Sequence, residues 1–448
     1  MLQRLKFVYA LSLTITFVLS VSWPAQASYR TTLHPSVSVS QEYTDNVDQV
    51  DDDLKESEWI TVISPSLALD VVGKTKGFNL SYTPGFTFYA DRDENDTVRQ
   101  SASLNAWAQP AKHLDLRWNN AFTRTEEPYE VEPLPLDLED LPRLEPEDFT
   151  FRRDRAPRSS YTSRINLGYQ FGPKDKANLG YRFRSVWDES PTAEDSIEHS
   201  PFLNISYWLS PQWGTEYSAE YTRGEFSGDT DTDDTDSFDE YTASVRLIRK
   251  FSKFVDGYMQ YKHTIFNNHG ESEDYQIFDP SVGMSWRFAQ DGNLSLSLGY
   301  YIKDNEDSDT DSDVSISADI SKGFDISRRT SFRITGGSGY EQSYFGAENL
   351  GFTVFFQGRG RLTHQFTKRL GSDLSASYRR NEFLDQTPER EDNIYDFQVG
   401  LSWQVLRRIS LRLSNTYRIV DSNLERDEYK ENRIVLSITY TPKPFLFK

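Results

Sequence analysis

The chain has 448 residues, no cysteine, and 69 acidic against 49 basic residues, which gives a formal net charge of −20 at pH 7. So acidic a chain lacks the electrostatics of nucleic-acid binding, and without cysteine it has neither disulfides nor thiol chemistry. Hydrophobic residues make up only 37% of the chain, whereas aromatic residues reach 14%. This composition indicates alternating rather than continuous apolar stretches.

Residues 1–27 have the pattern of a secretory signal peptide. Arg4 and Lys6 give the positive start, residues 7–23 are largely apolar, and residues 25–27 read Ala-Gln-Ala, a typical cleavage site. An uncleaved membrane anchor is the alternative, but it needs a longer apolar span. We therefore expect residues 28–448 to form the exported protein, in one domain.

After this leader, stretches of roughly ten to fourteen residues alternate apolar and polar side chains to the end of the chain. Residues 294–300, LSLSLGY, and 395–405, YDFQVGLSWQV, are examples. A period of two places apolar residues on one face of a strand and polar residues on the other. Breaks at Gly, Pro, Asn and Asp then divide the chain into about twenty strands, with roughly 18 as the alternative.

Two kinds of connection alternate between these strands. One is short and basic, as in residues 73–77 and 407–408, and the other is longer and acidic, as in residues 45–58 and 421–431. Successive antiparallel strands turn at opposite ends, so the turns share one rim and the loops the other. This is typical of an outer-membrane β-barrel with periplasmic turns and surface loops. We predict an all-β, antiparallel up-and-down barrel, and favour it over a soluble propeller or sandwich because no propeller repeat is present.

Aromatic residues lie near both predicted rims, with tryptophans close to the short turns and tyrosines close to the long loops. This distribution predicts two aromatic belts at the two membrane interfaces. The residues are Trp107, Trp208, Trp213, Trp286 and Trp403 near the turns, and Tyr43, Tyr89, Tyr275, Tyr300 and Tyr340 near the loops.

The polar face of the strands should line the lumen, because a lipid-facing Arg at mid-membrane costs about 2–4 kcal/mol. Charged residues on this face have both signs, with an excess of arginine. These charges favour a series of lumen side chains that guides an anionic or polyhydroxylated solute. The alternative is that the same side chains only brace the barrel wall. The expected lumen-lining residues are Arg164, Arg182, Arg184, Glu216, Glu220, Arg246, Arg287, Asp319, Arg333, Arg412 and Arg418.

The loop at residues 126–157 is long, acidic and rich in proline, which keeps it out of the sheet. Because about twenty strands enclose a wide lumen, we hypothesise that this loop folds inward as a constriction. Its carboxylates would face Arg164, Arg182 and Arg184, and an exposed surface loop is the alternative. The candidate constriction residues are Glu130, Glu132, Asp137, Glu139, Asp140 and Glu145.

Asp229, Asp231, Asp233 and Glu240 have the spacing of the first, third, fifth and last positions of a calcium loop. However, Asp234 stands where that loop needs glycine, and no predicted helices flank it. Solvated acidic loops are therefore favoured, and we expect no metal or other cofactor.

Enzyme chemistry has little support. His199 and His269 have acidic neighbours, but such neighbours are unavoidable in loops of this composition, and no G-x-S-x-G motif is present. We expect a protein that is not an enzyme.

Three segments near the start resemble a family of β-barrel porins of Gram-negative bacteria. They are QEYTDNV at residues 41–47, ISPSL at residues 63–67 and the strand at residues 82–89. Members are often encoded with exopolysaccharide synthesis and PEP-CTERM sorting systems. The resemblance is clearest over roughly the first hundred residues and rests on the general barrel pattern beyond them. It implies an outer-membrane β-barrel through which an exopolysaccharide leaves the cell, and it implies no catalytic residues.

We therefore expect a passive conduit for exopolysaccharide in the outer membrane, with loops at the cell surface. The expected partners are the lipid bilayer, lipopolysaccharide and periplasmic polysaccharide-export proteins, with polysaccharide or a small solute in the lumen and no nucleic acid. A diffusion porin for small anionic or sugar solutes, and a structural surface barrel with a blocked lumen, are the alternatives.

Overall fold

The computed structural model describes residues 29–127, 156–189, 195–227, 237–270, 273–290, 292–306, 310–345, 348–384, 390–424 and 427–447. The expected signal peptide lies outside them. They form twenty long strands, one strand of three residues and one short 3₁₀ helix, η1 (Asp93–Asn95). No helix in these ranges is long and apolar enough to cross a membrane.

The strands, in chain order, are β1 (Arg30–Thr44), β2 (Glu58–Val72), β3 (Lys76–Tyr89), β4 (Thr97–Ala111), β5 (Leu114–Thr125), β6 (Arg158–Gln170), β7 (Lys176–Asp188), β8 (Asp195–Trp208), β9 (Trp213–Ser227), β10 (Phe238–Lys250), β11 (Val255–Asn268), β12 (Tyr275–Ala289), β13 (Gly292–Asn305), β14 (Asp311–Ser327), β15 (Thr330–Phe345), β16 (Glu348–Gln365), β17 (Leu370–Phe383), β18 (Arg390–Leu406), β19 (Ile409–Ser422), β20 (Tyr429–Tyr440) and β21 (Phe445–Phe447).

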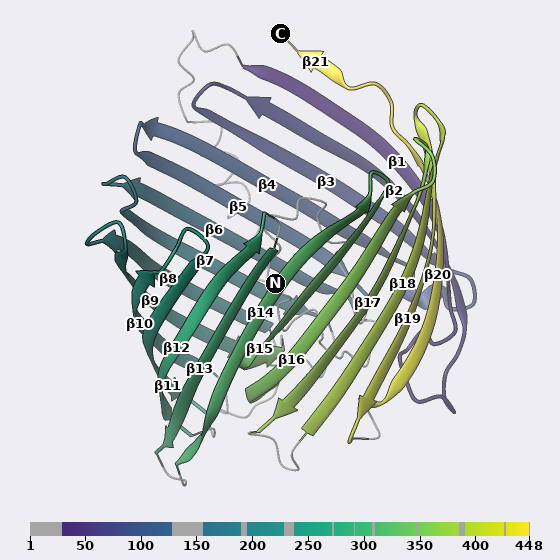
Figure 1. Cartoon of the computed structure of the whole chain (residues 1–448). Helices are drawn as coiled ribbons and strands as arrows, with labels where there is room; N and C mark the ends of the chain where they lie inside the picture. The colour runs from purple at the N-terminus through teal and green to yellow at the C-terminus, as the bar shows by residue number, and fades with distance from the viewer. Residues whose placement is uncertain are drawn as a thin grey trace.

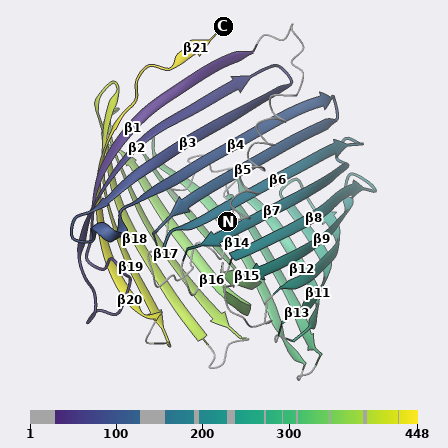
Figure 2. The same cartoon turned by 180° about the vertical axis from the view of Figure 1, so that it is seen from behind.

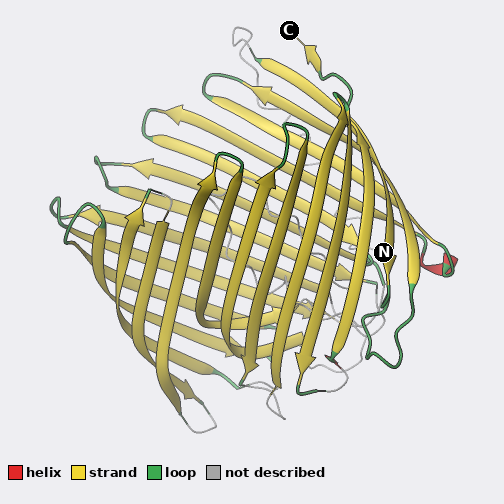
Figure 3. Ribbon diagram, turned by 45° about the vertical axis from the view of Figure 1, so that its right-hand side comes forward, coloured by secondary structure: helices red, strands yellow, loops and turns green. Residues whose placement is uncertain are grey.

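From β1 to β20, each strand pairs antiparallel with the next, and β20 pairs with β1, so the sheet closes on itself. Figures 1 and 2 show the strands following one another around a single inclined wall. Figure 3 shows that strands make up nearly all of the described fold. The prediction of an all-β, antiparallel barrel of about twenty strands is confirmed.

The pairing between β1 and the end of the chain, which closes the barrel, is interrupted between β20 and β21. β1 pairs with β20 over Val37–Thr44 and with β21 over Thr31–Leu33. Pro35, Pro442 and Pro444 lie in the intervening stretch, and proline has no N–H to give to a ladder. β21 therefore continues the line of β20 beside β1 (Figure 1).

Side-chain alternation gives the wall two faces. On β13, Leu296 and Leu298 are exposed on one face, and Ser297 lies between them on the other. The interior face is identified by Glu127, which contacts both Arg99 on β4 and Arg433 on β20. Because β1, β2 and β3 separate those two strands, only the concave side of the sheet can bring them together.

The expected aromatic belts are only partly present on the outward face. Trp107 and Trp208 instead lie on the interior face, opposite Gly77 and Gly214, and their rings cover the space beside these glycines. Tyr89 and Tyr275 are also interior and are buried. Alternation alone does not identify the outward face of a strand whose two faces both contain aromatics. The expected belt residues that do point outward include Tyr43, Trp213, Trp286, Tyr300 and Trp403.

The interior has two distinct halves, named here for the nearer rim. The loop-side half contains the three clusters of buried apolar residues found in the described ranges, one of them around Ile60 and Tyr89 and another around Ile394 and Val420. In the turn-side half, small hydroxyl side chains face one another across strands, as in the Ser81–Ser103 contact of 2.7 Å. The lumen is therefore packed toward the loops and polar toward the turns.

Candidate functional site

The structure places all eleven expected lumen-lining residues on the interior face. The strand registers show this, because directly paired residues share a face. For example, Arg164 is opposite Arg182, Arg246 is opposite Glu216, Asp319 is opposite Ser295, and Arg333 is opposite Arg361, while Arg184, Glu220, Arg287, Arg412 and Arg418 have the same alternation. Their role in solute passage stays a prediction.

At the middle of the wall and toward the turns, interior arginines that are half-exposed form ion pairs between strands. Arg182 Nη2 lies 2.6 Å from Glu220 Oε1, and Arg412 Nη2 lies 3.1 Å from Asp373 Oδ1. Arg246 Nη1 lies 3.5 Å from Glu216 Oε2, and Arg246 Nε and Nη2 donate to Gln260 Oε1. Such exposed pairs stabilise little, so their main effect is to present fixed charges to the lumen.

In the loop-side half, a buried network joins distant strands. Arg99 contacts Glu126 at 2.8 Å, and Arg433 contacts Glu127 at 2.9 Å and Glu42 at 2.6 Å. The two loop carboxylates are 1% and 5% exposed, and the Tyr89 hydroxyl donates to Glu126 as well. The start of the 126–157 loop is therefore anchored inside the barrel.

Two further buried arginines lie in the loop-side half, Arg379 on β17 and Arg418 on β19. Arg418 binds Asp396 through two hydrogen bonds of 2.6 and 2.9 Å. Arg379 is 1% exposed, donates to Asn381 Oδ1 at 2.6 Å, and places its guanidinium 4.6 Å from the ring of Phe355. These fixed, hydrogen-bonded charges hold the loop-side wall together.

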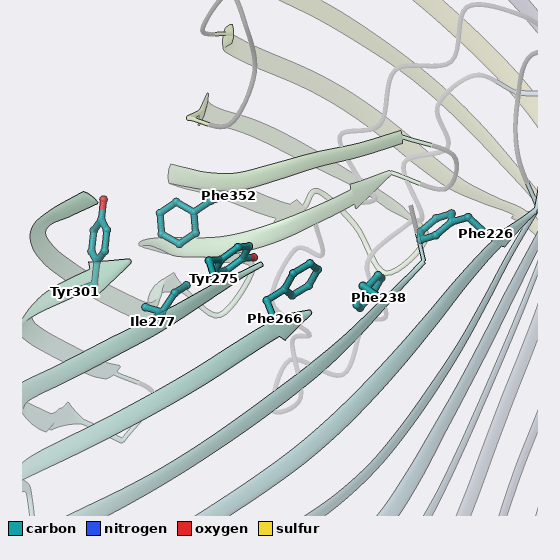
Figure 4. Packing of buried hydrophobic residues seen from close by; sticks show 7 residues of the cluster. All are labelled: Phe226, Phe238, Phe266, Tyr275, Ile277, Tyr301 and Phe352. Atoms are coloured by element: carbon teal, nitrogen blue, oxygen red, sulfur yellow. The ribbon is translucent and has the colours of Figure 1, made fainter. Parts of the chain in front are cut away.

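The largest apolar cluster crosses the interior of β9 to β13 and includes one residue of β16 (Figure 4). Phe238, Phe266 and Tyr275 form a stack with successive ring centroids 5.0 and 4.9 Å apart. Tyr301 and Phe352 extend it, with their centroids 5.4 Å apart. The cluster seals part of the loop-side half.

The hairpin of β15 and β16 enters the lumen at this cluster. β14 pairs with β15 only from Ile320 to Ser327, whereas β15 pairs with β16 along its whole length. Beyond Ile320, the Tyr340 hydroxyl donates to Asp279 on β12, and the amine of Lys262 on β11 lies 5.1 Å from the Tyr340 ring. The loop-side end of the hairpin therefore leans inward across β14.

Burial on both sides of β16 supports this inward position. Phe352 is 2% exposed and packs on the interior of β13, while the next residue, Thr353, is 0% exposed and faces the other way. Further along the same strand, Phe356 is 47% exposed on the outward face. A strand with lumen contacts on both faces narrows the channel, and we define this constriction as the inner hairpin, residues 337–345 and 348–357.

The proposed constriction loop is described only at its ends. Glu130, Glu132, Asp137, Glu139, Asp140 and Glu145 lie outside the described residues. Its described carboxylates, Glu126 and Glu127, contact Arg99 and Arg433 rather than the expected arginines. Those arginines have other contacts: Arg182 binds Glu220, Arg184 binds Glu198 at 3.3 Å, and Arg164 lies over the Phe202 ring.

The calcium candidates Asp229, Asp231 and Asp233 also lie outside the described residues. Glu240, the fourth, is on the interior face and accepts a hydrogen bond from Thr242 at 2.9 Å. His199 contacts the Tyr181 hydroxyl, and His269 lies 2.8 Å from Asp239. The absence of enzyme activity stays a prediction.

Sequence reasoning missed several interior charges. Arg359 and Arg361 lie on the interior face of β16, opposite Thr335 and Arg333. The segment Gln357-Gly358-Arg359-Gly360-Arg361 alternates polar residues with glycine, so its polar face could have been assigned by the same period of two. Arg99 and Glu42 carry the same signal, but the ion pair between distant strands does not follow from it.

These features define a porin-like outer-membrane β-barrel. The siderophore receptor PirA from Pseudomonas aeruginosa has a similar fold, with 9% identity and a TM-score of 0.51 over 91% of this chain and 80% of that one. PirA from Acinetobacter baumannii has 9% identity and a TM-score of 0.52 over 92% of this chain and 80% of that one. The FrpB iron transporter from Neisseria meningitidis has 11% identity and a TM-score of 0.51 over 91% of this chain and 81% of that one. At such identities the likeness shows the fold alone.

Residues 355–441 match the family model described as "Putative beta-barrel porin 2". The resemblance to a family of β-barrel porins is therefore confirmed, over β16 to β20 rather than over the first hundred residues. No curated protein sequence matches this chain.

Proposed function

We propose that the protein is an outer-membrane channel of a Gram-negative bacterium that conducts an exopolysaccharide outward. The observation that carries this proposal is the interior wall, where arginine, carboxylate and hydroxyl side chains line a closed barrel of twenty long strands. Hydroxyl and charged groups can exchange hydrogen bonds with a sugar chain without holding it in one place. The match to a porin family supports a channel.

In this proposal the short basic turns face the periplasm, where they would meet polysaccharide-export partners, and the long acidic loops face the cell surface among lipopolysaccharide. A diffusion porin for small anionic or sugar solutes is the second candidate, and the half-exposed Arg182 and Arg412 favour it. The inner hairpin favours a third, a structural barrel with a closed lumen.

A deletion strain tests the export function. We expect secreted polysaccharide to fall and periplasmic polysaccharide to rise, with both restored by the wild-type gene. A strain that lacks a polymerising glycosyltransferase is the control, because it loses secretion without periplasmic accumulation. Normal secretion in the deletion strain would contradict the export function, and loss of small-solute uptake instead would favour the diffusion porin.

A further inference from the structure

The interior face of β15 and β16 contains an unusual group of arginines. Arg333 is directly opposite Arg361, and Arg359 lies two residues further along β16 on the same face. On the other side, Arg361 and Arg359 are opposite Ser375 and Ser377 of β17. We name these three arginines the arginine patch. It lies in the turn-side half and is partly exposed to the lumen.

Arg359 and Arg361 differ in their partners from several other interior arginines. Within the described ranges, no carboxylate lies at ion-pair distance from Arg359 or Arg361, whereas Arg182, Arg246 and Arg412 each contact one. Like charges directly opposite each other destabilise a sheet. Arg359 and Arg361 therefore keep two guanidinium groups on the lumen wall that form no ion pair with a carboxylate of the described residues.

The neighbouring residues extend this charge toward the loops. Gln357, the next interior residue of β16, pairs with Arg379 of β17 and accepts a hydrogen bond from it at 3.2 Å. Arg379 donates to Asn381, and its guanidinium group lies over the Phe355 ring. The hydroxyls of the β17 serines lie beside the patch and can donate to the same ligand.

By contrast, the arginine pair on β6 and β7 is already satisfied. Arg164 is opposite Arg182, as Arg333 is opposite Arg361. However, Glu220 lies 2.6 Å from Arg182, and Arg164 lies 5.0 Å from the centroid of the Phe202 ring. This pair offers a matched control, because removing it takes away the same number of charges from the same face.

We infer that the arginine patch is a binding site for an acidic oligosaccharide, whose carboxylates the guanidinium groups hold. Guanidinium groups bind carboxylates through paired hydrogen bonds, and the serine hydroxyls suit the sugar hydroxyls. The inference rests on the proposed function for its sugar ligand, and it adds that the conducted polymer is anionic.

The test is calorimetric titration of the purified full-length protein in detergent with a galacturonate oligomer, and with a neutral glucose oligomer of equal length. We expect binding of the acidic oligomer alone, and a loss of affinity of about tenfold or more in Arg359→Gln/Arg361→Gln. Arg359→Lys/Arg361→Lys should keep part of the affinity, because it keeps the charge. Arg164→Gln/Arg182→Gln should lose less affinity than Arg359→Gln/Arg361→Gln, because Glu220 already pairs with Arg182.

Equal affinity in wild type and Arg359→Gln/Arg361→Gln would overturn the inference, as would an equal loss in both Gln variants. Inorganic phosphate that binds as tightly as the acidic oligomer would overturn the sugar class of the ligand. Heat-dependent mobility on gels confirms that each variant is folded. Because this binding is measured without transport, normal secretion in the deletion strain would refute the conduit while leaving the binding result intact.

Discussion

The two halves of the lumen differ most clearly along a single strand. Arg418 and Arg412 lie on the same face of β19, and each pairs with a carboxylate on the interior. The side chain of Arg418, in the loop-side half, is 5% exposed, whereas that of Arg412, in the turn-side half, is 42% exposed. An arginine paired with a carboxylate is thus structural at the loop end of β19 and available to solute at its turn end.

The surrounding side chains cause this difference. Toward the loops, Phe238, Phe266 and Tyr275 stack on the wall, and the inner hairpin crosses in front of β14. Toward the turns, serines such as Ser285 and Ser295 leave room for water. We therefore assign occlusion to the loop-side half and solute contact to the turn-side half, and three changes test this division.

The largest effect should come from moving the inner hairpin. If the β14–β15 ladder continued in its observed register, Ile316 would pair with Tyr340, and the Ser338 hydroxyl already bridges Ala318 N and Ile316 O. The chain has no cysteine, so Ile316→Cys/Tyr340→Cys can form a single disulfide that holds the hairpin in the wall. We expect severalfold higher single-channel conductance after oxidation, reversed by reduction.

The control uses the same position of the hairpin. In Tyr301→Cys/Tyr340→Cys, a short thiol crosslinker should hold the hairpin inward, because the two rings are 5.6 Å apart in the structure. Conductance should then stay at the level of the uncrosslinked protein. Equal conductance in both crosslinked variants would show that the inner hairpin does not limit flow.

A smaller effect should appear in stability. Arg418→Met leaves Asp396 buried without its partner, and breaking a buried pair in this way costs about 3–5 kcal/mol. Arg412→Met should cost less, because the side chain of Arg412 is 42% exposed and water in the lumen already screens its pair with Asp373. Urea unfolding of the refolded barrel, followed by tryptophan fluorescence, measures both.

A second substitution separates charge from packing. Adding Asp396→Asn to Arg418→Met should recover part of the loss, because it removes the stranded negative charge. Equal destabilisation by Arg418→Met and Arg412→Met would mean that the two halves do not differ in the way proposed here.

The strands and their polar face could be predicted from the sequence because both follow from the period of two. Arg246 and Glu216 fall on the interior for this reason, and the exposed Leu296 and Leu298 fall outside. The acidic and basic connections also mark the two rims, since each lies between segments of strand length. These properties depend on neighbours in sequence.

Contacts across the lumen could not be predicted in this way. Arg433 meets Glu127 although 306 residues separate them, and no local pattern pairs them. Trp208 alternates like an interface residue but faces inward against Gly214, because the glycine leaves space for its ring. The inward lean of Tyr340 depends on where the β14–β15 ladder stops, which the alternation does not determine.

The smallest effect concerns an exposed ion pair that ties the loop at residues 45–57 to β20. Lys430 Nζ lies 3.0 Å from Asp52 Oδ2, and Lys55 Nζ lies 3.0 Å from Asp52 Oδ1. The hydrogen bonds from Lys430 and then Lys55 lower the pKa of the Asp52 carboxyl below its ordinary value. A lowered carboxyl pKa stabilises the fold above the unfolded-state pKa, and this contribution is lost as the pH falls through the folded-state pKa.

Asp52→Asn should therefore lower the stability at about pH 7 by less than about 1 kcal/mol, because both partners are exposed, and the difference should vanish in strong acid. Lys430→Ala should have a larger effect than Lys55→Ala, since only Lys430 joins the loop to another strand. Melting curves across this pH range measure these differences. If Asp52→Asn cost as much as Arg418→Met, burial would not be what separates the strong ion pairs of this barrel from the weak ones.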